Sequence, residues 1–145
     1  MKKNNPVGIL LITHSGIGAE LLKTAKVTFG RLPASLKLIS VQPLHDPDDL
    51  IDQVSAILDA IDLGSGVLVL TDLYGATPCN IALQFYKESN HKVKVVAGLN
   101  LPMLFRVLNY SVLSLDELVE KAYLGGRDGV IQLPEESVTP LVTVE

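Results

Sequence analysis

The chain has 145 residues, of which 48% are apolar and 19% are charged, and its formal net charge is −4. This length suits one domain of roughly 100–200 residues with a packed core, and the high apolar fraction excludes an intrinsically disordered chain. The negative charge provides no broad basic surface, so we expect no nucleic-acid partner.

The cysteine content and the hydropathy indicate where in the cell the protein is expected. Cys79 is the only cysteine, and a lone thiol forms no disulfide within the chain, which favours a reducing cytoplasm. The apolar run that starts at Val7 meets His14 too soon for a signal peptide. No apolar stretch approaches the ~20 residues that span a bilayer. We therefore expect a cytoplasmic protein that does not insert into a membrane.

The first half of the chain alternates apolar strands with helices. The first apolar run is continuous, which is typical of a strand covered on both faces. Asp46 is a good N-cap, and Pro47 suits the first helical position. In chain order, these patterns predict a strand over 7–13, a turn over 14–18, a helix over 19–29, a strand over 36–41 and a helix over 47–61.

The second half repeats this alternation. Thr77 and Pro78 give another cap-and-proline start, and Ser114 and Glu117 form a capping box. The predicted elements are a strand over 66–72, a turn over 73–76, a helix over 77–88, a strand over 93–97, a helix over 101–107, a helix from 115 to about 125–126, and a short strand over 129–133. We expect one domain over residues 1–133 and a C-terminal tail over 134–145.

Alternating strands and helices predict a three-layer α/β fold, with a parallel sheet between helices and right-handed crossovers. In such sheets, ligands bind beyond the carboxyl ends of the strands, where the strand order switches direction. His14 follows the first strand, and Asp72 ends the third. In the common strand order 2-1-3-4, those strands are neighbours. We therefore expect His14 and Asp72 to face each other.

A His–Asp pair in this position indicates nucleophilic chemistry. A carboxylate that accepts a hydrogen bond from one ring nitrogen fixes the tautomer and leaves the other nitrogen as a nucleophile. Residues 15–18 and 76–77 open two helices, whose free N–H groups and dipoles favour an anion. Gly16 and Gly75 allow close backbone approach, and the Thr77 hydroxyl can donate.

Each of these residues also has a purely structural interpretation. A histidine at a strand end is often a surface residue, an aspartate there often caps a loop, and Thr-Pro is primarily a helix start. The joint placement of His14 and Asp72 favours function. His45 is expected in a loop, and His91 precedes the fourth strand, at the opposite end of the sheet. Cys79 is expected to be a small buried side chain.

Four segments, in order, resemble the enzyme IIA domain of the mannose-type (mannose/fructose/sorbose) phosphotransferase system. They cover most of residues 7–133 and begin with the strand that leads into Thr-His-Ser. The segments are VGILLITHSGIGAELLKTAKVTFG, GVLVLTDLYGATPCNIA, VVAGLNLPMLFRVL and SLDELVEKAYLGGRDGV.

The resemblance implies that His14 accepts a phosphoryl group from the phosphocarrier protein HPr and passes it to an enzyme IIB, while Asp72 orients the ring. It implies sheet order 2-1-3-4 plus a C-terminal antiparallel strand, residues 129–133, exchanged in a homodimer. No cofactor or metal is implied. The residues expected to contact the phosphate or support the site are Thr13, Ser15, Gly16, Gly75, Thr77 and Asn100.

Ser15 stands where many relatives have Gly, and Tyr74 where some have Trp, which could alter the docking surface. The chain ends without an enzyme IIB domain, so we expect a separate subunit that serves transport or regulation. Two alternatives are a regulatory module that senses an anion or a partner without covalent chemistry, and a small metal chelatase. The chelatase would need a second histidine beside His14, and His45 and His91 look badly placed for that.

Overall fold

The computed structural model describes residues 5–134 and contains one sheet of four parallel strands in the order β2-β1-β3-β4. This confirms the predicted α/β class and strand order. The strands differ from the predicted segments by at most one residue at either end. They are β1 (Gly8–His14), β2 (Leu36–Val41), β3 (Val67–Thr71) and β4 (Val93–Ala97).

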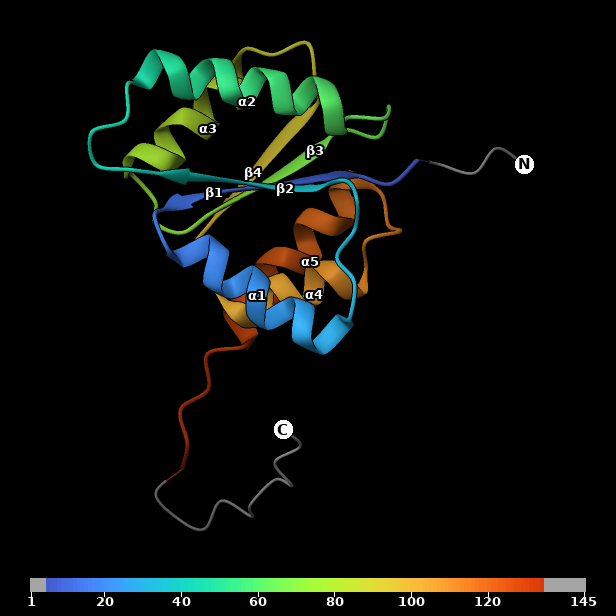
Figure 1. Cartoon of the computed structure of the whole chain (residues 1–145). Coiled ribbons are helices and arrows are strands. Elements are labelled where there is room, and N and C mark those ends of the chain that lie inside the picture. Colours follow the sequence, from blue (N-terminus) through green and yellow to red (C-terminus); the bar gives the residue numbers. More distant parts are fainter. Residues whose placement is uncertain (1–4, 135–145) are drawn as a thin grey trace.

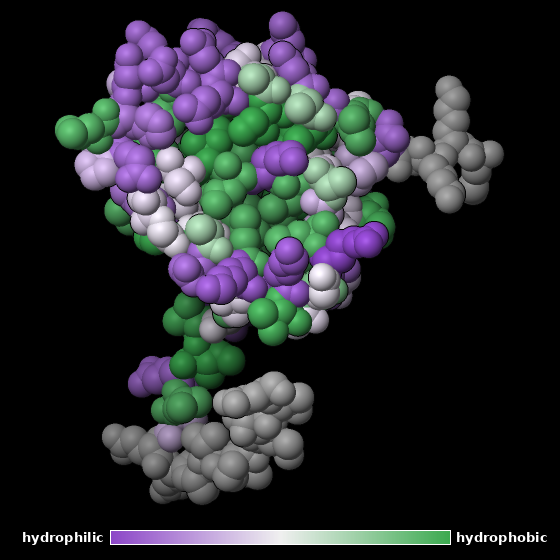
Figure 2. All heavy atoms as spheres, in the orientation of Figure 1, coloured by the Kyte–Doolittle hydropathy of each residue, from purple (hydrophilic) through white to green (hydrophobic). Residues whose placement is uncertain are grey.

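The described residues also form five helices: α1 (Ile17–Phe29), α2 (Pro47–Ile61), α3 (Thr77–Lys87), α4 (Leu101–Asn109) and α5 (Leu115–Asp128). α2 and α3 cover one face of the sheet, and α1, α4 and α5 cover the other (Figure 1). Hydrophilic side chains gather over α2 (Figure 2), as expected for a helix whose opposite side packs on the sheet.

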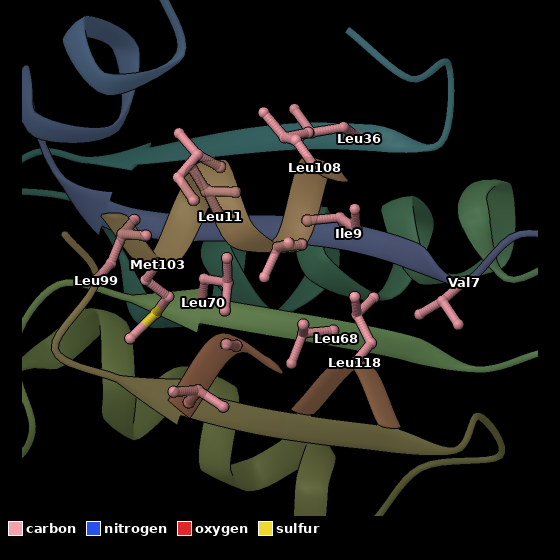
Figure 3. Packing of buried hydrophobic residues seen from close by; sticks show 14 of the residues in the cluster. Val7, Ile9, Leu11, Leu36, Leu68, Leu70, Leu99, Met103, Leu108 and Leu118 are labelled. Atoms are coloured by element: carbon pink, nitrogen blue, oxygen red, sulfur yellow. The ribbon is translucent and has the colours of Figure 1, made fainter. Parts of the chain in front are cut away.

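The sheet is covered on both faces, which explains why its central strands β1 and β3 are almost continuously apolar, whereas the edge strands β2 and β4 each contain a lysine. Along β1, Ile9 and Leu11 pack in one cluster with α1, α4 and α5 (Figure 3), while Leu10 and Ile12 pack in a second cluster with α2 and α3. All four side chains are fully buried. Burial of each such side chain stabilises the fold by about 1.5–3 kcal/mol, so β1 is held firmly from both sides.

Helix α5 extends beyond its predicted end. Gly125 and Gly126 were expected to stop it, but it continues to Asp128. A Cβ on Gly125 would lie 2.6 Å from Cβ of Arg106, so this glycine allows α5 to pack closely on α4. The glycines are therefore packing residues within the helix, which sequence patterns alone do not distinguish from a helix stop.

Residues 130–134 leave α5 without forming a strand in the single chain (Figure 1). The exchanged antiparallel strand over 129–133 would need a second copy and stays a prediction. Of the predicted tail, residues 135–145 lie outside the described residues. Between residues 5 and 134, no helix combines the length and hydrophobicity needed to cross a bilayer.

Candidate active site

His14 and Asp72 meet at the carboxyl ends of the neighbouring strands β1 and β3. Ile12 is level with Thr71 in the strand register, which brings the following residues of the two strands side by side. Oδ2 of Asp72 accepts the backbone N–H of His14 at 3.0 Å and lies 2.8 Å from Nδ1 of the same residue. The structure thus shows the juxtaposition expected from the sequence.

This geometry fixes the protonation pattern of the ring. A carboxylate only accepts hydrogen bonds, so the nitrogen beside it, Nδ1, carries the hydrogen, and Nε2 keeps its lone pair. The side chain of His14 is 45% exposed, whereas that of Asp72 is 6% exposed. Within residues 5–134, the other carboxylate oxygen, Oδ1, is buried without a hydrogen-bond partner. His14 therefore combines an oriented ring with access for a reacting partner.

A cleft of about 510 Å³ opens beside the His14 ring. Its walls come from the loops that follow β1, β2 and β3, which all end at this edge of the sheet. The cleft is lined by His14, Ser15, Val41, Gln42, Pro43, His45, Pro47 and Thr77. This volume is within the range of small-ligand sites and can take a phosphoryl group.

Two helices begin beside the pair. The N-cap positions of α1 and α3 are Gly16 and Ala76, and neither supplies a side-chain cap. Gly16 and Gly75 have φ angles of 90° and 83°, a conformation that favours glycine. Thr77 is exposed at the first position of α3 and lines the cleft. The N–H groups at the start of α3, which no side chain caps, and the helix dipole favour an anion here.

Two of the expected site residues use their polar groups inside the protein. The buried Thr13 hydroxyl donates to the carbonyl of His14 at 2.9 Å and accepts the N–H of Gly18 at 2.9 Å. The Asn100 amide accepts the N–H of Met103 at 2.9 Å and donates to the carbonyl of Gly126 at 3.1 Å. Both side chains hold neighbouring backbone in place, which is a supporting role rather than a contact with phosphate.

His45 lies closer to the site than expected. It is in the loop between β2 and α2, as predicted, but it lines the same cleft as His14, so the view that it is badly placed was wrong. Periodicity does not reveal the path of a loop. The strand order does predict that His45 lies near His14, because the loop after β2 leaves the sheet at the same end as the loop after β1.

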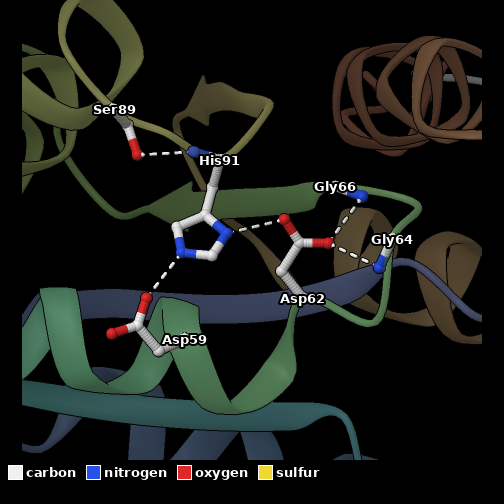
Figure 4. Close-up of polar contacts among 6 residues, drawn as sticks. All are labelled: Asp59, Asp62, Gly64, Gly66, Ser89 and His91. Atoms are coloured by element: carbon white, nitrogen blue, oxygen red, sulfur yellow. Dashed lines mark hydrogen bonds and ion pairs between the residues drawn. The ribbon is translucent and has the colours of Figure 1, made fainter.

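His91 lies near the start of β4, at the opposite end of the sheet, as expected (Figure 4). Its Nε2 is 2.7 Å from Asp59 and its Nδ1 is 2.7 Å from Asp62, and hydrogen bonds to Asp59 and Asp62 raise the pKa of His91. Burial acts to raise the pKa of Asp62, but the N–H of Gly64 and the His91 ring outweigh it and lower that pKa. Both ring nitrogens are engaged, so this cluster is a structural ion pair.

The fold and the site define a doubly wound α/β protein with an oriented histidine at the switch point of its sheet. Residues 8–123 match the sequence profile of the family described as the PTS system fructose IIA component. The chain belongs to this family, the enzyme IIA components of the mannose-type phosphotransferase system, and is thus a phosphotransferase component. This confirms the resemblance inferred from the sequence.

Relatives agree with this assignment. The mannose-specific EIIAB component of Escherichia coli K12 is 34% identical over 139 residues, which are 92% of this chain and 42% of the relative. The chain therefore spans about two fifths of the length of the curated relatives it matches. The mannose/sorbose-specific IIA subunit from Enterococcus faecalis is 28% identical with a TM-score of 0.79, over 93% of this chain and 100% of that structure. EIIA from Streptococcus agalactiae, at 23% identity, TM-score 0.78 and coverage of 87% and 96%, supports the fold alone.

Proposed function

We propose that the chain carries a phosphoryl group on His14, which it receives from phosphorylated HPr and passes to an enzyme IIB or uses as a regulatory signal. The observation that carries this proposal is the 2.8 Å contact between Nδ1 of His14 and Asp72, beneath a ring that is 45% exposed. The contact engages Nδ1 and leaves Nε2 as the nucleophilic nitrogen of a ring that lines the cleft.

In the transfer step, the lone pair of Nε2 attacks the phosphorus of the incoming group. The Nε2–P bond forms as the bond from phosphorus to the donor atom breaks, and the electron pair of that bond stays with the donor. The Nδ1 hydrogen remains shared with Asp72, whose carboxylate stabilises the positive charge that develops on the ring. Transfer to the acceptor follows the same path in reverse.

The phosphoryl oxygens would be held by the uncapped N–H groups at the start of α3, by the Thr77 hydroxyl and by the turn that contains Ser15 and Gly16. Gly75 belongs to the turn that brings α3 to this position. A phosphoryl group carries close to two negative charges at neutral pH, so donors of this kind stabilise it. Thr13 and Asn100 support the surrounding backbone.

We further propose that residues 1–133 form the functional domain and that the protein works in the cytoplasm, where its protein partners are. We also propose that two copies form a homodimer by exchanging residues 129–133. β4 is an edge strand, and Val130, Ile131 and Leu133 are 77%, 72% and 66% exposed in the single chain. The apolar segment that follows α5 in one copy is suited to pair, as an added strand, with the open sheet edge of a second copy. Light scattering on a chain truncated after residue 128 tests this: it should become monomeric if the exchange holds the dimer together.

Incubation with phosphorylated HPr tests the phosphoryl transfer. The wild type should form an adduct that is labile in acid and stable in base, and His14→Ala should form none while unfolding at a similar temperature. If the wild type takes no label, the proposal fails. Saturable binding of inorganic phosphate without any adduct would instead favour a sensing module.

The position of His45 gives the chelatase alternative one favourable observation, since two histidines now line one cleft. However, no group of three or more His, Cys, Asp or Glu side chains within residues 5–134 could hold a metal ion together. Calorimetric titration with Co²⁺ or Zn²⁺ separates the two functions: a tight stoichiometric site that is lost in His14→Ala would favour the chelatase.

A further inference from the structure

The cleft offers little positive charge to balance a phosphoryl group. A phosphoryl group on His14 would bring close to two negative charges at neutral pH into a site that already has the Asp72 carboxylate behind the ring. Among the residues that line the cleft there is no lysine or arginine. Apart from His14 itself, His45 is the only histidine that lines the cleft, which makes its ring N–H a candidate donor to the anion.

The hydrogen bonds of His45 fix its tautomer. Its Nδ1 accepts the backbone N–H of Gln42 at 3.2 Å. A ring nitrogen that accepts a hydrogen bond carries no hydrogen, so the neutral ring carries its hydrogen on Nε2. His45 therefore keeps an N–H donor on the side of the ring away from its own loop, which is the property a phosphoryl-binding group needs.

The loop that carries His45 is tied to the turn after His14. The backbone N–H of His45 donates to the carbonyl of Gln42 at 3.1 Å, which closes a tight turn. The Gln42 side chain then donates to the hydroxyl of Ser15 at 3.0 Å, and the backbone N–H of Ser15 donates to the carbonyl of Val41 at 3.0 Å. These bonds couple the position of the His45 loop to that of the His14 turn.

We propose that His45 is a further phosphate-contacting residue, whose Nε2–H donates to an oxygen of the phosphoryl group carried on His14. This inference rests on the proposed function of His14. A hydrogen bond to a charged acceptor is about twice as strong as a neutral one, so it would stabilise the phosphorylated form selectively. The equilibrium between phosphorylated HPr and this chain should then shift toward this chain.

Two substitutions separate this role from the structural role of the ring. His45→Asn keeps an oxygen near the position of Nδ1, which can accept the N–H of Gln42, but lacks the distal donor. His45→Gln places an amide N–H2 near the position of Nε2. With HPr and phosphorylated HPr as the probe, we expect His45→Asn to lower the equilibrium constant for phosphorylation of His14 about tenfold, the effect of one good hydrogen bond. His45→Gln should recover most of that loss.

Nitrogen-15 NMR of the histidine rings gives a second readout, since phosphorylation of His14 should shift the Nε2 resonance of His45. An unchanged equilibrium constant in His45→Asn, equal losses in both variants, or an unmoved His45 resonance would each overturn the inference. In those three cases the labelled wild type would still support the proposed function. A wild type that takes no phosphate would overturn both.

Discussion

Replacement of Asp72 by asparagine isolates the charge of the carboxylate from its shape. Oδ2 of Asp72 accepts both the backbone N–H and Nδ1 of His14. Because the backbone N–H of His14 can only donate, the amide of Asp72→Asn should keep its oxygen in that position. The ring should then keep its hydrogen on Nδ1 and its lone pair on Nε2, so the substitution removes charge without reversing the tautomer.

The size of the effect follows from that geometry. Hydrogen bonds to charged groups contribute about 1.5–3 kcal/mol and neutral ones about 0.5–1.5 kcal/mol, and the difference weighs most where positive charge develops on the ring. A loss of about 1–3 kcal/mol slows transfer roughly tenfold to hundredfold. Reversal of the histidine tautomer would cost about 10⁴-fold. Asp72→Ala leaves the N–H of His14 without this acceptor and frees the ring. The loss of transfer rate in Asp72→Ala should therefore be larger than that in Asp72→Asn.

Rapid-quench measurement of phosphoryl transfer from phosphorylated HPr gives the rates for the wild type and both variants. Asparagine also places an N–H2 group where Oδ1 is buried, and an unsatisfied donor costs about 1–3 kcal/mol, so thermal unfolding must accompany the kinetics. A folded Asp72→Asn protein with a rate within twofold of the wild type, or one as slow as Asp72→Ala, would refute this account of the carboxylate.

Three further predictions concern side chains that do not contact the transferred group in the proposed function. Hydrogen bonds to Asp59 and Asp62 raise the pKa of His91. The stabilisation that protonated His91 gives is therefore complete below about pH 6.5 and is lost as the pH rises through the raised pKa. In urea unfolding, the difference in stability between wild type and His91→Gln should shrink above neutral pH, and a constant difference would contradict this. Thr13→Val leaves a buried N–H unsatisfied and should lower the free energy of unfolding by about 1–3 kcal/mol, whereas Thr13→Ser should recover most of it in the same urea titration. Asn100→Ala removes an N-cap and should cost about 0.5–2 kcal/mol, with the rate of phosphoryl transfer per folded molecule unchanged; a large loss of rate would show that Asn100 acts at the site.

The strands were predictable because β1 and β3 are apolar over almost their whole length and β2 and β4 are mostly apolar. Their order was predictable because it is a common order of doubly wound sheets. Burial on both faces leaves little ambiguity between a strand and a surface segment, as Ile9 to Ile12 illustrate. The end of α5 was not predictable, because glycine serves both to stop a helix and to let helices approach. Gly125 does the second, and only its distance to Arg106 on another helix reveals that.

The site was predictable where it depends on strand ends and not where it depends on loops. His14 and Asp72 follow directly from strand order, because parallel neighbours end at the same edge. His45 was misjudged, since the course of a turn depends on hydrogen bonds such as that to Gln42. Thr13 and Asn100 have polar groups suited to a ligand, and their internal partners on Gly18 and Gly126 are visible only in three dimensions.

The position of His14 on a central strand has a kinetic consequence. β1 is flanked by β2 and β3 and covered on both faces, so its last residue cannot travel toward a partner. Asp72 engages Nδ1 of the imidazole, which leaves Nε2 as the ring nitrogen that a partner can reach. Under the proposed function, donor and acceptor would both have to reach this one nitrogen, so delivery and removal of the phosphoryl group would alternate. Steady-state measurements with both proteins varied should therefore give the parallel double-reciprocal lines of a ping-pong sequence.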